Sequence, residues 1–154
     1  RQAQWVRYYA KTHSNSEFSI VDLNKRDKKT ITAKVKELNS IAGASGVIVI
    51  SPEYASRAFS ARLFELFKGV SRRSADLPVA FVSYGQKKGL SFIENLRINA
   101  KKLCFSPIRR SVHLVEPWMK LNQKGEFSDR SAESELNKML KQLTSLSSPK
   151  ALTT

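Results

Sequence analysis

The chain has 154 residues, of which 41% are hydrophobic and 26% are charged, a balance that is ordinary for one globular domain with its own core. No apolar run approaches the ~18 residues that cross a bilayer, and the single cysteine, Cys104, excludes an internal disulfide and is typical of a reducing compartment. The 27 Lys and Arg residues against 13 acids give a net charge of +14, which a metabolic enzyme does not need and which is typical either of proteins that bind polyanions or of a solvated basic surface.

The first segment of the chain is predicted to be a basic helix. Trp5, Val6 and Tyr9 lie at helical spacing and predict a helix over Gln2–Thr12. Residues 1–16 contain three Lys or Arg residues and no acid, a composition that also fits the end of an organelle-targeting segment. A basic first helix of the domain is the favoured interpretation.

The next three predicted elements are a strand, a helix and a second strand. Alternating apolar residues predict a strand over Phe18–Leu23, and a charged turn follows it. Ile31, Val35 and Leu38 lie on one face of a predicted helix. The β-branched run Val47–Ile50 is short, unbroken and bounded by turn residues, which predicts a buried strand.

Two further helix–strand pairs follow in the same order. Apolar residues at helical spacing predict one helix over Phe59–Val70 and another over Leu90–Leu103. A strand is predicted after each helix, first over Val79–Ser83 and then over Ser111–Val115.

A last helix closes the predicted domain. Asp129 or Ser131 is expected to cap it, because a short polar side chain accepts hydrogen bonds from the first free N–H groups of a helix. Its buried stripe is predicted to consist of Leu136, Met139, Leu140, Leu143 and Leu146. We therefore predict one domain over residues 1–146 and a flexible tail over residues 147–154.

The strict alternation of helices and strands predicts an α/β fold with a parallel sheet and helices on both of its faces. In such folds ligands bind beyond the carboxyl ends of the strands. Function is therefore expected at two places, the Pro52–Tyr54 segment (PEY) and the Ser83–Gly85 segment (SYG), which come at the ends of two buried strands.

These two segments, in this order, resemble the NADPH-dependent FMN reductase family. The helix that begins at Gly89 and the closing Gly125–Phe127 segment extend the resemblance to about residues 18–146. The resemblance implies a flavodoxin-like three-layer α/β/α fold that binds FMN and NADPH. It also implies that the flavin ring is contacted by Pro52, Glu53, Tyr54, Ser83, Tyr84 and Gly85.

The chain departs from that family in features that hold the flavin. The sequence begins after the position of the family's first strand and phosphate loop, so both are expected to be missing. Ala55 stands where the family has Asn, and the basic segment Asn24–Lys29 replaces a longer loop. Without a phosphate loop most of the specific FMN affinity should be lost. We therefore predict a degenerate family member with no bound cofactor and no catalytic residue.

The basic residues form clusters that predict a nucleic-acid interface. Those that follow strands are expected at the carboxyl edge of the sheet, and those that follow helices or precede a strand at the opposite edge. Helix-dipole complementation explains only some of them, whereas contact with RNA phosphates through charge and shape explains the excess. The predicted contact residues are Lys25, Arg26, Lys28, Lys29, Arg57, Arg72, Arg73, Lys87, Lys88, Lys101, Lys102, Arg109 and Arg110.

The remaining reactive side chains favour structural roles. His113 lies in a predicted strand, where a hydrogen-bonded core or edge histidine is expected. Cys104 lies near a helix end and is expected to be a buried structural thiol. No His or Cys cluster has metal-ligand spacing, so no metal site is predicted.

The sequence leaves two functions open, and only the second of them would make the chain an enzyme. The favoured one is an FMN reductase-like domain that has lost flavin catalysis and contacts RNA and neighbouring proteins in a ribonucleoprotein such as an organelle ribosome. Its location would be the mitochondrial matrix or the cytoplasm. The alternative is an active NAD(P)H-dependent flavin or quinone oxidoreductase, in some members homo-oligomeric, whose phosphate loop precedes this sequence.

Overall fold

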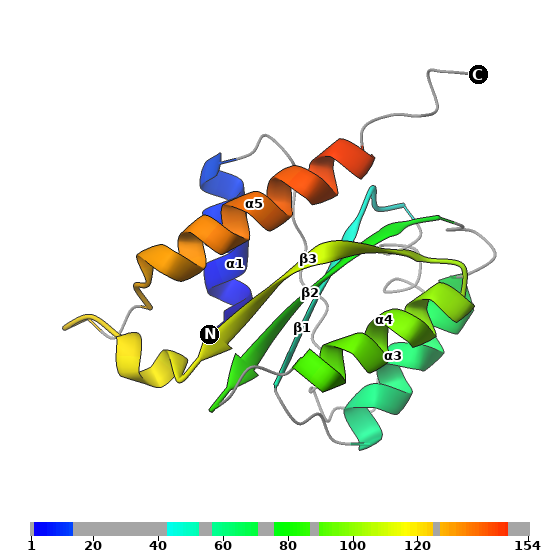
Figure 1. The fold of residues 1–154 in the computed structure, drawn as a ribbon, viewed down its shortest axis with the longest axis horizontal. Helices are drawn as coiled ribbons and strands as arrows, with labels where there is room; N and C mark the ends of the chain where they lie inside the picture. The colour runs from blue at the N-terminus through cyan, green and yellow to red at the C-terminus, as the bar shows by residue number, and fades with distance from the viewer. Residues whose placement is uncertain are drawn as a thin grey trace.

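The computed structural model describes residues 2–13, 43–52, 57–70, 76–86, 90–124 and 127–147. Helices and strands alternate through most of these residues (Figure 1). The predicted strand Phe18–Leu23 and the helix after it lie outside the described residues. The described elements are α1 (Gln2–His13), β1 (Val47–Pro52), α3 (Arg57–Val70), β2 (Pro78–Gly85), α4 (Leu90–Lys102), β3 (Ser106–Val115), η1 (Pro117–Lys120) and α5 (Arg130–Ser147).

The three described strands form one parallel sheet in which β2 lies between β1 and β3. The chain passes through α3 between β1 and β2 and through α4 between β2 and β3, as parallel pairing requires. Helices flank both faces of the sheet (Figure 1). This arrangement confirms the predicted α/β class and is that of a flavodoxin-like three-layer fold.

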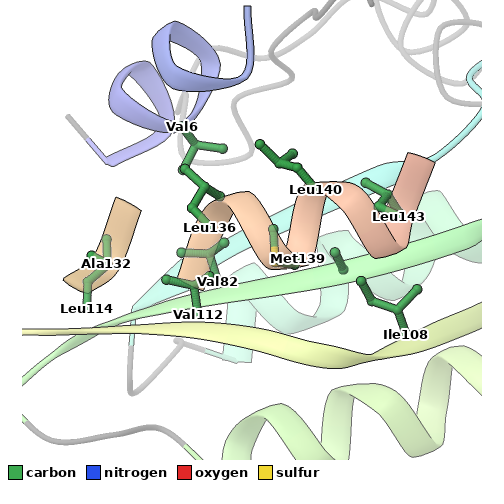
Figure 2. Packing of buried hydrophobic residues seen from close by; sticks show 11 residues of the cluster. Val6, Val82, Ile108, Val112, Leu114, Ala132, Leu136, Met139, Leu140 and Leu143 are labelled. Atoms are coloured by element: carbon green, nitrogen blue, oxygen red, sulfur yellow. The ribbon is translucent and has the colours of Figure 1, made fainter. Parts of the chain in front are cut away.

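One face of the sheet is covered by α5 together with α1. Leu136 and Met139 of α5 are completely buried against this face, which presents Val82 of β2 and Val112 of β3 (Figure 2). Val6 of α1 packs on the same cluster, so the first helix belongs to the domain core. Because successive residues of a strand point to opposite faces, these positions alternate with those of the second core.

The opposite face is covered by α3 and α4. Phe81, at the centre of β2, is completely buried among apolar residues that include Phe67 of α3 and Ile93 of α4. Phe105, just before β3, closes this core, with its ring centroid 4.6 Å from that of Phe67. Every residue from Pro78 to Ser83 is buried, as expected for a strand that is covered on both faces.

The last helix begins as predicted but its apolar stripe ends earlier. The Oδ1 atom of Asp129 accepts hydrogen bonds from the N–H groups of Ser131 and Ala132 at 3.0 and 3.3 Å, so Asp129 is the cap. The prediction of Leu146 as a buried residue is wrong, because its exposed fraction is 40%. The other four residues of the predicted stripe are buried. Leu146 follows the sequence period but lies in the last turn of α5, beyond the residues that pack on the sheet.

The Asp129 carboxylate also forms an ion pair with Lys120 of η1, with 2.6 Å between Nζ and Oδ2. Partial burial raises the pKa of Asp129, but the hydrogen bond from Lys120, the Ala132 N–H group, the Lys120 charge and the Ser131 N–H group together outweigh burial. They hold the pKa of the Asp129 carboxyl below its ordinary value. A lowered folded-state pKa stabilises the fold above the unfolded-state pKa, and this contribution is lost as the pH falls through the folded-state value.

Replacing this cap tests both of its functions. Asp129→Ala is expected to lower the free energy of unfolding by about 0.5 to 2 kcal/mol at neutral pH, since it removes the capping oxygen. Asp129→Asn keeps a capping oxygen but does not titrate, so its stability should fall less than that of the wild type below about pH 5. Urea denaturation at neutral and acidic pH measures both effects. Equal pH dependence in the wild type and Asp129→Asn would contradict the assigned pKa shift.

The third strand is longer than predicted. It begins at Ser106 and not at Ser111, so Arg109 and Arg110 lie inside the strand and not before it. Pro107 and the two arginines hide the strand pattern in the sequence, since Pro lacks the N–H group that a central strand needs. Within the described sheet β3 pairs with β2 alone, and an edge strand tolerates both proline and charge.

Candidate functional site

The carboxyl ends of the described strands meet at one edge of the sheet, as the parallel fold requires. Pro52 of β1 is in register with Tyr84 of β2, and Tyr84 is in register with Leu114 of β3. The two motifs that were predicted from the sequence to lie together therefore do begin side by side. Glu53 and Tyr54 lie outside the described residues.

The three SYG residues differ in what they offer at this edge. Ser83 is 1% exposed. It lies two residues after Phe81 and therefore on the same face of the sheet, which α3 and α4 cover. Tyr84 points to the opposite face and packs against the core formed with α1 and α5. The carbonyl oxygen of Gly85 accepts a hydrogen bond from the N–H group of Glu116 at 2.7 Å. The Ser83 hydroxyl is therefore closed to a ligand at this edge, and the Gly85 carbonyl oxygen already has a hydrogen-bond partner.

A hydrogen-bonded polar cluster lies just inside this edge. The Ser83 Oγ and His113 Nδ1 atoms are 2.8 Å apart, and the Ser111 Oγ and His113 Nε2 atoms are 2.9 Å apart. Either tautomer of a neutral imidazole suits two hydroxyls, because a hydroxyl both donates and accepts. Ser51 of β1 is fully buried and in register with Ser83, so polar residues occupy the same row in three strands.

This cluster confirms the structural interpretation of His113 and extends it. The sequence offered one signal, the Ser-x-His spacing that places Ser111 and His113 on the same face of a strand. It offered no signal for the bond to Ser83, 30 residues away. The cluster can hold the ends of β2 and β3 together, because a buried polar group that keeps its partner avoids the cost of desolvation.

The strand edge continues into a short exposed segment. Glu116 has a left-handed backbone conformation with φ of 46°, which turns the chain from β3 into η1. Pro117 is buried, whereas Trp118 and Met119 of η1 are exposed. A large aromatic side chain in solvent is notable because Trp is highly buried on average.

Four of the predicted RNA-contacting residues have described side chains, and all four are exposed. Lys101 and Lys102 end α4, and Arg109 and Arg110 lie in the first half of β3. The end of α4 and the start of β3 lie at the amino edge of the sheet, opposite the SYG segment, whereas the two arginines lie within β3. The side chain of Arg57 and the residues Lys25, Arg26, Lys28, Lys29, Arg72, Arg73, Lys87 and Lys88 lie outside the description.

Two side chains from the flanking helices hold the backbone of this arginine pair. Nη2 of Arg97 in α4 donates a hydrogen bond to the carbonyl oxygen of Arg109 at 2.7 Å. Oε1 of Gln142 in α5 accepts a hydrogen bond from the N–H group of Arg110 at 3.1 Å. Arg97 also forms an ion pair with Glu94 of the same helix. The arginine pair is thus tied to the helical layers on both faces of the sheet.

The remaining predictions concern the thiol, metal binding and the membrane. Cys104 is exposed, so the prediction of a buried thiol is wrong. Its φ of 66° places it in a tight turn in which Phe105, and not Cys104, enters the core. Within the described segments, no group of three His, Cys, Asp or Glu side chains is placed to hold a metal ion. None of the helices described combines the length and hydropathy of a bilayer span.

Comparisons with known proteins add no identity to these observations, since no family model and no curated protein matches the chain. The resemblance to FMN reductases therefore stays a prediction from sequence motifs alone. The fold, the polar cluster at the carboxyl edge and the basic residues at the amino edge are therefore the observations from which function is argued.

Proposed function

We propose that this chain is a flavodoxin-like domain, derived from the FMN reductase family, that contacts RNA through its basic surface. The net charge of +14 is the observation that carries the proposal. In this view the domain is a structural subunit of a ribonucleoprotein, such as an organelle ribosome, in the mitochondrial matrix or the cytoplasm. Its partners are RNA phosphates and neighbouring proteins.

Exposed cations at the amino edge of the sheet support this proposal. Lys101, Lys102, Arg109 and Arg110 follow one another closely along the chain and are all exposed. No described acid forms an ion pair with any of the four. Cations without a protein counter-charge bind phosphates well, since binding releases the counterions that surround nucleic acid.

The carboxyl edge gives the flavin alternative some support and some difficulty. Pro52 and Tyr84 are neighbours in register, which is the arrangement that a flavin ring between the two motifs would need. The Ser83 hydroxyl, however, is buried in the cluster with His113, and the Tyr84 ring packs on the core. These contacts favour a structural role for the residues at the strand ends. An NAD(P)H-dependent flavin oxidoreductase is therefore the second candidate function.

One preparation of the protein separates the two functions. We expect the purified chain to lack the visible absorption band of a flavin, to take up no added FMN and to oxidise no NADPH. We expect it to bind RNA, with the logarithm of the affinity falling linearly with the logarithm of the salt concentration. The slope for single-stranded RNA should be about −0.7 for each phosphate that the protein neutralises. A yellow protein that oxidises NADPH, or one that does not bind RNA at low salt, would overturn the proposal.

A further inference from the structure

The third strand contains a bulge at the position of the two arginines. Pro107 is in register with Val79, and Ser111 is in register with Phe81. Three residues of β3, 108 to 110, therefore lie opposite the single residue Ala80 of β2. Extra residues in one strand, here two, bend it and redirect its side chains, and bulges occur often beside functional sites.

The bulge is built rigidly for a segment that is exposed. Ile108 is 2% exposed and packs into the core with α5, which anchors the bulge from inside. The carbonyl of Arg109 and the N–H group of Arg110 are the two backbone groups that Arg97 and Gln142 bind. Figure 1 shows β3 running between α4 and α5, from which these two side chains come. The backbone of the bulge is thus fixed on three sides.

The side chains of the bulge face solvent with positive charge around them. Arg109 and Arg110 are exposed. Lys101 lies one helical turn beyond Arg97 on α4, and Lys141 is the neighbour of Gln142 on α5, and both are exposed. The acid on this part of α4, Glu94, already pairs with Arg97. The bulge therefore presents two exposed guanidinium groups on a backbone that α4 and α5 hold.

We infer that this bulge is a phosphate-binding element, in which Arg109 and Arg110 contact neighbouring phosphates of an RNA backbone. The inference rests on the proposed function and names the part of the surface that carries it. A guanidinium group matches a phosphate with two parallel hydrogen bonds, and a fixed backbone reduces the entropy lost on binding. Arg97 and Gln142 are positioning residues, since they bind the backbone of the bulge and not the RNA.

Removing the two charges of the bulge tests the contact. Arg109→Gln with Arg110→Gln should weaken RNA binding about tenfold or more, since hydrogen bonds to charged groups are lost. The salt dependence should correspond to about two fewer phosphates. The control is Arg62→Gln with Lys68→Gln, which removes the same charge from exposed positions on α3. Equal losses in the two double variants would show that only total charge matters and would overturn the inference.

A second variant tests the positioning. Gln142→Met keeps the length of the side chain but removes the acceptor for the Arg110 N–H group. It should lower RNA affinity several-fold while leaving the salt slope unchanged, because both charges remain, and it should speed hydrogen exchange at the Arg110 amide. Faster exchange with unchanged RNA affinity would show that the bulge serves the fold alone, for example by protecting an edge strand from self-association.

The outcomes distinguish this inference from the proposed function. If the wild-type chain binds no RNA, both fail. If it binds RNA with a steep salt slope and the bulge variant behaves like the control, only the inference fails. Vesicles of phosphatidylserine and phosphatidylcholine provide the last arm, because lipid headgroups carry the same phosphate chemistry. A bulge variant that loses vesicle binding but keeps RNA binding would assign the bulge to a membrane surface and overturn the inference.

Discussion

Leu136→Ala is expected to lower the free energy of unfolding by about 2 to 5 kcal/mol. Leu136 of α5 has an exposed fraction of 0% and packs against the sheet and against Val6 of α1 (Figure 2). The substitution removes apolar contacts and leaves a cavity, since the ion pair between Asp129 and Lys120 ties the start of α5 to η1 and limits its movement toward the sheet. Urea denaturation followed by circular dichroism measures the loss.

Leu146→Ala is the matched control, because it makes the same change in the same helix. Leu146 is 40% exposed, so its replacement should change the free energy of unfolding by no more than about 0.5 kcal/mol. Similar losses at the two positions would show that Leu146 packs on the domain in solution. That result would restore the stripe predicted from the sequence and contradict the arrangement of α5 described above.

The second large effect is expected in the polar cluster at the carboxyl edge. Ser83→Ala should lower the free energy of unfolding by about 1 to 3 kcal/mol, because it leaves Nδ1 of His113 without its partner in β2. The methyl group of alanine fits where the serine side chain stood, so the loss reports the hydrogen bond and not a change in packing. Chemical denaturation of the wild type and the variant at the same pH gives the value.

A double-mutant cycle isolates this hydrogen bond. Ser83→Ala, His113→Leu and the double variant are compared, and the double variant should be more stable than the sum of the two single losses predicts. An interaction energy of about 0.5 to 1.5 kcal/mol is expected. Ser111→Ala is the companion test, since it removes the partner of Nε2 on the same strand. Strict additivity in the cycle would contradict the bond between Ser83 and His113.

Local patterns in the sequence were enough to predict the described core elements. The run Val47–Ile50 is apolar and β-branched, and it forms the main part of β1. The spacing of Leu136, Met139, Leu140 and Leu143 predicted the face of α5 that is buried. Asp129 was one of the two caps predicted for this helix, and it is the one that accepts the capping hydrogen bonds. In each case residues that are neighbours in the sequence create the pattern, so no knowledge of distant contacts is needed.

The errors occur where residues distant in the sequence meet. The start of β3 was missed because Pro107 and the arginines oppose a strand pattern, and the pairing with β2 overrides that pattern. Cys104 was expected in the core, but it is exposed. It lies in a turn in which its carbonyl oxygen accepts a hydrogen bond from the N–H group of Asp76. Leu146 follows the helical period, but it lies in the last turn of α5 and outside the buried cluster. Each of these outcomes depends on what the residue meets in the folded chain and not on the residue type alone.

The sequence was sufficient for the α/β class, the parallel sheet, the capped last helix and the large positive charge, since composition and periodicity carry them. The fold had to bring Ser83 to His113, Arg97 to the Arg109 carbonyl, and Gln142 to the Arg110 N–H group. These partners are 30, 12 and 32 residues apart. Hydrogen bonds over such separations depend on the strand register and on how the helices pack on the sheet, and the periodicity of one segment does not specify either.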